Sequence, residues 1–219
     1  MYQERNAVVS MRSVIILAGG RSNRFGKDKG LVSLADKALI EHVYENVREV
    51  AKEVVVAISS KGQRDVYSRF LDRCTFSIDE QHCKGPLSGL WSALKIVKAK
   101  KVAIVACDMP FVSGNLLNLF FELCTRQDAV IPRWPNGYIE ALHAVYDSVN
   151  CLAATSTALD KGCRNLRSMI SSLHRILYVS TEVIREIQPE FTMFTNINSG
   201  RDLIVARRIL AMQSLGQSQ

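Results

Sequence analysis

Continuous apolar runs alternate with segments of helical periodicity between residues 13 and 131. Most of these runs are rich in β-branched residues, which is typical of strands buried on both faces of a parallel sheet. The predicted strands are Ser13–Ala18, Glu53–Ser59, Thr75–Ile78, Lys101–Ala106 and Ala129–Ile131. The segments between them carry apolar residues at helical spacing. The predicted helices are Leu39–Ala51, Gln63–Leu71, Pro86–Lys98 and Asn115–Cys124, the last capped by Ser113.

The pattern is looser after residue 131. Tyr138–Tyr146 has the composition of one long strand. The other elements expected here are helices over Val149–Leu159, Asn165–Ser172 and Asp202–Met212, the last capped by Ser199, and a strand over Arg175–Val179.

This alternation of strands and helices predicts parallel strands joined by right-handed crossovers, with helices on both faces of the sheet. The expected fold class is α/β, a Rossmann-like three-layer α/β/α domain with a mostly parallel central sheet. We expect residues 1–12 to form an N-terminal arm and residues 13–212 to form a single domain.

The composition is that of a globular protein. The chain has 219 residues, of which 47% are hydrophobic, enough to bury a sizeable core. No apolar run approaches the length of a membrane span, and no secretory signal is visible. The six cysteines form no C-x-x-C pair, so we interpret them as small interior residues in a reducing compartment. We therefore expect a cytoplasmic protein.

The formal net charge of +7 favours an anionic partner. The basic residues are dispersed, and no stripe combines them with aromatic residues as RNA-binding surfaces do. We therefore expect a small ligand with several phosphates, and neither a nucleic acid nor a membrane.

A glycine-rich loop follows the first buried strand. Leu17 and Ala18 lead into Gly19 and Gly20, and the segment continues to Lys29 with Arg21 and Arg24 on the way. Glycines let backbone N–H groups approach an anion closely, and ligands of parallel sheets bind at the carboxyl ends of the strands. The sequence is neither G-x-G-x-x-G nor a phosphate loop ending in Lys-Ser/Thr. An ordinary turn would explain the two glycines alone, but the whole block predicts phosphate binding.

Asp108 follows the fourth predicted strand and should lie at the same edge of the sheet as the glycine loop. Mg²⁺ often takes only one or two protein carboxylates, with phosphates and water completing its shell. A turn or capping role beside Pro110 would also explain this residue. The nearby loop favours metal binding.

Two further segments carry candidate recognition groups. Asp79 precedes Gly85 and Gly89, and its carboxylate could accept the N1–H and amino hydrogens of guanine, a donor pair that adenine lacks. Asn196 and Asn198 should point the same way from an extended segment and could bind the edge of a pterin. Taken alone, both segments are better explained as loops with helix-capping residues.

The whole set of motifs resembles a known family. The motifs, in order, are Leu17 to Lys29 (LAGGRSNRFGKDK), Gly85 to Gly89 (GPLSG), Cys107 to Phe111 (CDMPF) and Phe194 to Asn198 (FTNIN). They resemble the molybdenum cofactor guanylyltransferases, members of a nucleotidyltransferase superfamily with a Rossmann-like fold. The resemblance covers roughly residues 13–212.

The resemblance implies a Mg²⁺-dependent enzyme that transfers GMP from GTP to molybdopterin, with possible transient contacts to other cofactor-biosynthesis proteins or acceptor enzymes. Three groups of residues carry the implied roles. Leu17, Ala18, Gly19, Gly20, Arg24 and Lys29 would bind the nucleotide phosphates, with Lys29 at the α-phosphate. Asp79 and Gly85 would bind guanine. Asp108 would bind the metal, with Lys29 and Arg24 completing the catalytic set, and Asn196 and Asn198 would contact the acceptor.

The chain departs from the family pattern at turns. Leu34–Ile40 lacks the usual Gly and Pro, Glu140 precedes Ala141 rather than a proline, and Ser199-Gly200 replaces Thr-Pro. Two alternatives therefore stay open: another phosphorylated acceptor (cobinamide phosphate, a sugar phosphate or phospholactate), and a GTP-binding protein without catalysis.

Overall fold

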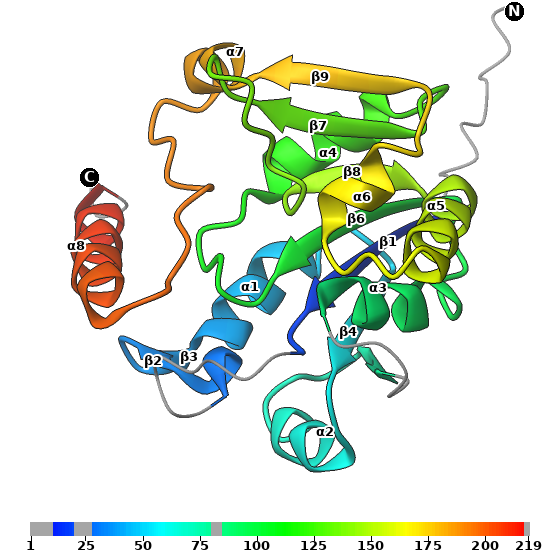
Figure 1. Cartoon of the computed structure of the whole chain (residues 1–219). Helices are drawn as coiled ribbons and strands as arrows, with labels where there is room; N and C mark the ends of the chain where they lie inside the picture. Colours follow the sequence, from blue (N-terminus) through cyan, green and yellow to red (C-terminus); the bar gives the residue numbers. More distant parts are fainter. Residues whose placement is uncertain (1–10, 20–27, 80–84, 217–219) are drawn as a thin grey trace, which may run out of the picture.

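A mixed sheet forms the centre of the protein (Figure 1). The computed structural model describes residues 11–19, 28–79 and 85–216. Within them, seven strands pair in the order β5-β4-β1-β6-β8-β7-β9. The bounds are β1 Arg12–Leu17, β4 Glu53–Ile58, β5 Thr75–Ile78, β6 Lys101–Ala106, β7 Ala129–Arg133, β8 Ala144–Asp147 and β9 Ile176–Ser180. All neighbours pair in parallel except β8, which is antiparallel to both β6 and β7.

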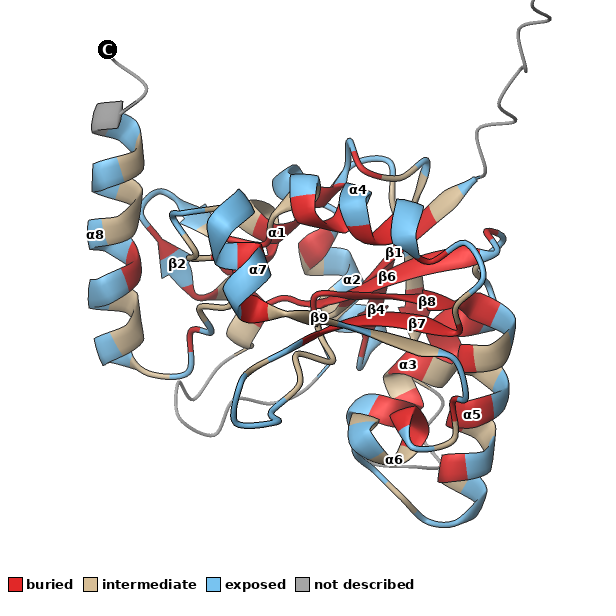
Figure 2. Ribbon diagram, turned by 90° about the horizontal axis from the view of Figure 1, so that it is seen from above, coloured by how far each residue is buried: buried red, intermediate tan, exposed pale blue. Residues whose placement is uncertain are grey.

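Helices cover both faces of the sheet, which confirms the expected α/β/α layers (Figure 2). One apolar cluster joins the sheet to α1 (Leu39–Val47), α4 (Gly114–Leu123) and α7 (Thr181–Ile187). A second cluster joins it to α3 (Pro86–Leu94), α5 (Ser148–Asp160) and α6 (Leu166–Ile170). The sheet is therefore buried on both faces, as its apolar runs predicted.

Three smaller elements and two more helices complete the described chain. The short elements are η1 (Lys29–Leu31), β2 (Ser33–Leu34) and β3 (Lys37–Ala38), the last two forming an antiparallel hairpin. The helices are α2 (Lys61–Tyr67) and α8 (Gly200–Gly216). An apolar cluster packs α8 against the hairpin rather than against the sheet. The hairpin and α7 were not predicted from the sequence.

The prediction of one long strand over Tyr138–Tyr146 is wrong. The chain turns sharply after β7, where the N–H of Trp134 donates to the Tyr138 carbonyl at 2.8 Å. His143 then takes a left-handed conformation with φ of 100°, which interrupts the extended backbone. Only β8 remains as strand, and it returns antiparallel between β6 and β7, so the sheet is mostly parallel, as expected.

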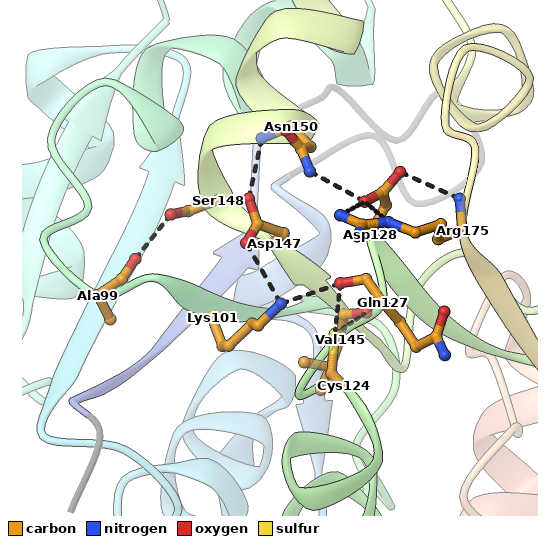
Figure 3. A network of polar contacts seen from close by, with 10 residues as sticks. All are labelled: Ala99, Lys101, Cys124, Gln127, Asp128, Val145, Asp147, Ser148, Asn150 and Arg175. Carbon is orange, nitrogen blue, oxygen red and sulfur yellow. Dashed lines mark hydrogen bonds and ion pairs between the residues drawn. The ribbon is translucent and has the colours of Figure 1, made fainter. Parts of the chain in front are cut away.

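Buried polar groups secure this antiparallel strand (Figure 3). Lys101 pairs with Asp147, its partner across β6 and β8, and also donates to the Gln127 carbonyl at 2.9 Å. Asp128 accepts hydrogen bonds from the backbone N–H groups of His174 and Arg175 and from the Arg175 guanidinium. Burial alone would raise the pKa of Asp128, but these donors lower it to about 2. The network joins β6, β8 and β7 to the start of β9.

Three further expectations concern membrane-spanning helices, the cysteines and the N-terminal arm. Within the described residues, no helix has both the length and the apolar character needed to cross a membrane. The described cysteines are free thiols, three of them buried: Cys107, Cys124 and Cys151. The predicted arm, residues 1–12, falls largely outside the described residues, and its last residue, Arg12, begins β1.

Candidate active site

The carboxyl ends of β1, β4, β5 and β6 bring the predicted site segments to one edge of the sheet. Leu17 ends β1, and the N–H of Ala18 donates to the Ala57 carbonyl of β4 at 2.9 Å. A β-carbon on Gly19 would lie 3.1 Å from the Ser59 hydroxyl, so glycine permits this close approach to β4. Gly20 and Arg24, the other residues predicted for this loop, lie outside the described residues.

Lys29 joins three predicted segments. Its ammonium forms an ion pair with Asp108 Oδ2 and donates to Asn198 Oδ1 at 2.7 Å. The side chains of Lys29 and Asp108 are only 19% and 17% exposed. The low local polarity strengthens an ion pair of this kind relative to one in water. A cation and a carboxylate are thus held together beside an amide where β1 and β6 end.

Asp108 has a second feature that distinguishes it from a turn residue. Its Oδ1 atom is buried and has no hydrogen-bond partner among the described residues. An unpaired buried carboxylate oxygen is costly, so such groups usually have a partner. This oxygen therefore offers a ligand position that no described side chain fills.

The Asn196–Asn198 segment is fixed to the turn after β6. The N–H of Ile197 donates to the carbonyl of Asp108 at 2.9 Å, and the Ile197 side chain is fully buried. The two asparagines flank this anchor and are exposed. Ser199 Oγ accepts from the N–H of Asp202 at the start of α8, while the Asn198 side chain reaches Lys29 instead of capping the helix. The segment therefore presents the Asn198 amide to Lys29, while the Asn196 amide donates to the Phe194 carbonyl at 3.2 Å.

Asp79 and Gly85 lie where β5 leads toward α3. The N–H of Asp79 extends the pairing of β5 with β4 by donating to the Ile58 carbonyl at 2.8 Å. Its carboxylate accepts a hydrogen bond from the Ser88 hydroxyl in the first turn of α3. Gly85 has φ of 133°, and a β-carbon there would lie 3.0 Å from the Arg164 carbonyl. Glycine is therefore required at this position.

Two site residues were not predicted. Gln63 and Tyr67 lie one helical turn apart on α2 and both donate to the carboxylate of Asp28, the residue before Lys29. Their spacing of four residues on one helix face was the available signal. No local pattern indicates that this face of α2 meets the Asp28–Lys29 corner.

Comparisons with known proteins show the family of the chain. Residues 14–176 match the family model described as "MobA-like NTP transferase domain". A probable molybdenum cofactor guanylyltransferase from Methanosarcina mazei is 34% identical over 200 residues, covering 89% of each chain. One from Pyrococcus horikoshii is 33% identical over 192 residues, covering 86% of this chain and 95% of the relative.

Solved structures extend the likeness to three dimensions. Molybdopterin-guanine dinucleotide biosynthesis protein A from Archaeoglobus fulgidus superposes with a TM-score of 0.78 at 28% identity, covering 91% of this chain and 99% of its own. A 2-C-methyl-D-erythritol 4-phosphate cytidylyltransferase from Thermus thermophilus shares the fold, with a TM-score of 0.67 at 18% identity. The chain therefore belongs to the MobA-like nucleotidyltransferases, the family of the molybdenum cofactor guanylyltransferases.

Proposed function

We propose that this protein transfers GMP from GTP to the terminal phosphate of molybdopterin, in its metal-free or molybdenum-bound form. The products are the guanine dinucleotide cofactor and pyrophosphate. The observation that carries the proposal is the junction of Lys29, Asp108 and Asn198 at the carboxyl edge of the sheet. The names of the curated relatives support the same substrate pair.

The reaction is a direct in-line displacement. An oxygen of the acceptor phosphate forms a bond to the α-phosphorus of GTP, and the bond from that phosphorus to the bridging oxygen of pyrophosphate breaks. A phosphate monoester is already anionic near neutral pH, so the enzyme needs no strong general base. The main obstacle is repulsion between the acceptor phosphate and the triphosphate. Fixed cations and oriented N–H groups reduce it.

Lys29 is proposed to neutralise the α-phosphate. Its ammonium is held by Asp108 and Asn198 before substrate arrives, so little reorganisation is needed when negative charge builds up. Gly19 and Gly20 are proposed to bring backbone N–H groups to the triphosphate, and Arg24 to add a second cation.

Asp108 is proposed to hold Mg²⁺. Its buried and unpartnered Oδ1 fits a hard cation that prefers carboxylate oxygens. No group of three or more His, Cys, Asp or Glu side chains suited to a metal occurs among the described residues, so Asp108 would share the ion with substrate phosphates. Bound there, the ion would supply charge neutralisation on the phosphate oxygens.

Asp79 and Gly85 are proposed to select guanine. A carboxylate beside the start of α3 can accept two hydrogens from the guanine edge, and Gly85 precedes the first turn of that helix. Asn196 and Asn198 are proposed to contact the pterin, because both side chains are exposed and Asn198 bonds Lys29.

We place the reaction in the cytoplasm. The free thiols of the described cysteines fit a reducing compartment.

The mass of the product tests the proposal. The protein is incubated with GTP and Mg²⁺ together with molybdopterin, cobinamide phosphate, a sugar phosphate or phospholactate. The expected product carries one added GMP on molybdopterin only. GMP on a different acceptor would assign another substrate, and tight GTP binding without any product would favour a binding protein.

A further inference from the structure

Gln63 and Tyr67 enclose the carboxylate of Asp28. Tyr67 donates its hydroxyl hydrogen to Asp28 Oδ1 at 2.8 Å, and the Gln63 amide donates to Asp28 Oδ2 at 2.8 Å. The backbone N–H of Gly30 donates to Asp28 Oδ1 at 3.0 Å. Both carboxylate oxygens are therefore satisfied, and Asp28 is turned away from the neighbouring Lys29, whose ammonium bonds Asp108.

Gln63 also reaches the root of the glycine loop. Its amide nitrogen lies 2.8 Å from the Ala18 carbonyl, and its amide oxygen accepts from the N–H of Ser59 at 2.8 Å. One side chain thus connects the ends of β1 and β4 to the residue before Lys29. A glutamine can do this because it carries both a donor and an acceptor group.

Burial keeps Tyr67 in the donating form. Its side chain is fully buried, and burial, together with the nearby Cys107 and Asp28, raises the pKa of its hydroxyl. The backbone of Gly30 packs so closely on this hydroxyl that a β-carbon at that position would overlap it. Tyr67, Gly30 and Asp28 therefore fit together in one arrangement only.

We infer that Gln63 and Tyr67 are positioning residues for Lys29, acting through Asp28. The inference rests on the proposed function, in which Lys29 meets the α-phosphate. If the donors were removed, the Asp28 carboxylate would be free to compete with Asp108 and the substrate for the adjacent ammonium. The Tyr67 hydroxyl donates to Asp28, whereas Gln63 also bonds Ala18 and Ser59 at the ends of β1 and β4.

A double-mutant cycle between Tyr67→Phe and Lys29→Ala tests this inference. Tyr67→Phe removes a single hydroxyl, and Lys29→Ala removes the group on which that hydroxyl is inferred to act. The dissociation constant of GTP and kcat/KM for pyrophosphate release are measured for all four proteins. The dissociation constant of GTP can still be measured when turnover is too slow to follow.

We expect Tyr67→Phe to lower kcat/KM about tenfold and to raise the dissociation constant of GTP, because a hydrogen bond to a charged group is lost. In the Lys29→Ala background the same change should have less than about a twofold effect. Equal losses in both backgrounds, or no loss in either, would overturn the inference. Gln63→Leu should weaken GTP binding more than Tyr67→Phe does.

Tyr44→Phe is the matched control. The Tyr44 hydroxyl also bonds an aspartate, Asp72, but at the opposite end of β4 from the site. Both Tyr→Phe variants should lower the melting temperature, and only Tyr67→Phe should change GTP binding and turnover. If the wild-type protein makes no product with molybdopterin, the proposed acceptor fails, while the GTP-binding cycle still decides the role of Tyr67.

Discussion

The ammonium of Lys29 is bonded to the carboxylate of Asp108 across 79 positions of sequence. β1 and β6 are neighbouring parallel strands, so the segments that follow them emerge side by side at one edge of the sheet. The Asn196–Asn198 segment closes the group from the far end of the chain by bonding both residues. A cation and a carboxylate are in this way placed before any substrate binds, as electrostatic catalysis requires.

Replacing Asp108 with asparagine should abolish most turnover while leaving the fold intact. The substitution preserves size but removes the charge that pairs with Lys29, and it replaces one carboxylate oxygen by an NH2 group, which cannot bind Mg²⁺. We expect kcat to fall at least about a hundredfold. Asp160→Asn, an exposed change at the end of α5, is the control and should match the wild type. Mg²⁺-dependent turnover of Asp108→Asn at the wild-type rate would refute the metal assignment.

Replacing Gly30 with alanine should damage both stability and activity. The new β-carbon would overlap the Tyr67 hydroxyl, and relieving the overlap costs about 1–3 kcal/mol of unfolding free energy. Urea denaturation measures this loss. Tyr67→Phe should restore part of it, because the nearest remaining contact is the ring carbon at 3.1 Å.

Gly62→Ala serves as the control for that experiment. A β-carbon on Gly62 meets only the Ser60 hydroxyl at 3.9 Å, so alanine there should be neutral or mildly stabilising. Equal stability of Gly30→Ala and wild type would show that Tyr67 does not restrict this corner.

His143 should make the protein less stable in mild acid. Burial lowers the pKa of its ring from 6.5 to about 4 in the folded protein, and neither ring nitrogen has a hydrogen-bond partner among the described residues. The carbonyls of Met193 and Ser113 offset this effect only in part. Below pH 6.5 the unfolded chain binds a proton that the folded ring refuses, so stability falls as the pH drops toward 4.

The difference between wild type and His143→Leu isolates this effect. As the pH drops from 7 to 4, the wild type should lose up to about 3 kcal/mol of unfolding free energy relative to the variant. Chemical denaturation at several pH values measures it. A difference that does not change with pH would mean that folding does not lower the pKa of the ring.

Replacing Ala35 with glycine should stabilise the β2–β3 hairpin. Ala35 occupies the turn with φ of 54°, a left-handed conformation that glycine adopts without steric cost. We expect a gain of about 0.5–1 kcal/mol, measured by urea denaturation. A loss of stability would indicate that the alanine methyl group contributes packing that outweighs the backbone strain.

Much of the sheet could be predicted because its strands are continuous apolar runs. β5 and β6 have the predicted bounds, and β4 ends one residue earlier than predicted. The cap at Ser113 is confirmed, since its hydroxyl accepts from the N–H of Leu116. Helix ends were less predictable: α1 and α3 each stop four residues before the predicted end, because apolar periodicity continues into the following loop.

The site was predicted where side chains lie next to strand ends, and missed where tertiary packing decides. Lys29 and Asp108 meet at one edge of the sheet, as expected, and Asn198 joins them, although the roles of all three stay predictions. The contacts of Gln63 and Tyr67 depend on how α2 packs against the Asp28 corner, which no local pattern encodes. The reversal of β8 likewise follows a left-handed His143, a conformation that is uncommon for non-glycine residues and that no local pattern marks.

Pyrophosphate release tests the central claim most directly. The protein is mixed with Mg²⁺ and GTP, CTP, ATP or UTP, each with and without molybdopterin. We predict release with GTP plus molybdopterin and with no other combination. Release with CTP at an equal rate would contradict the assignment of Asp79 to guanine, and no release with GTP and molybdopterin, despite GTP binding, would contradict the proposed acceptor.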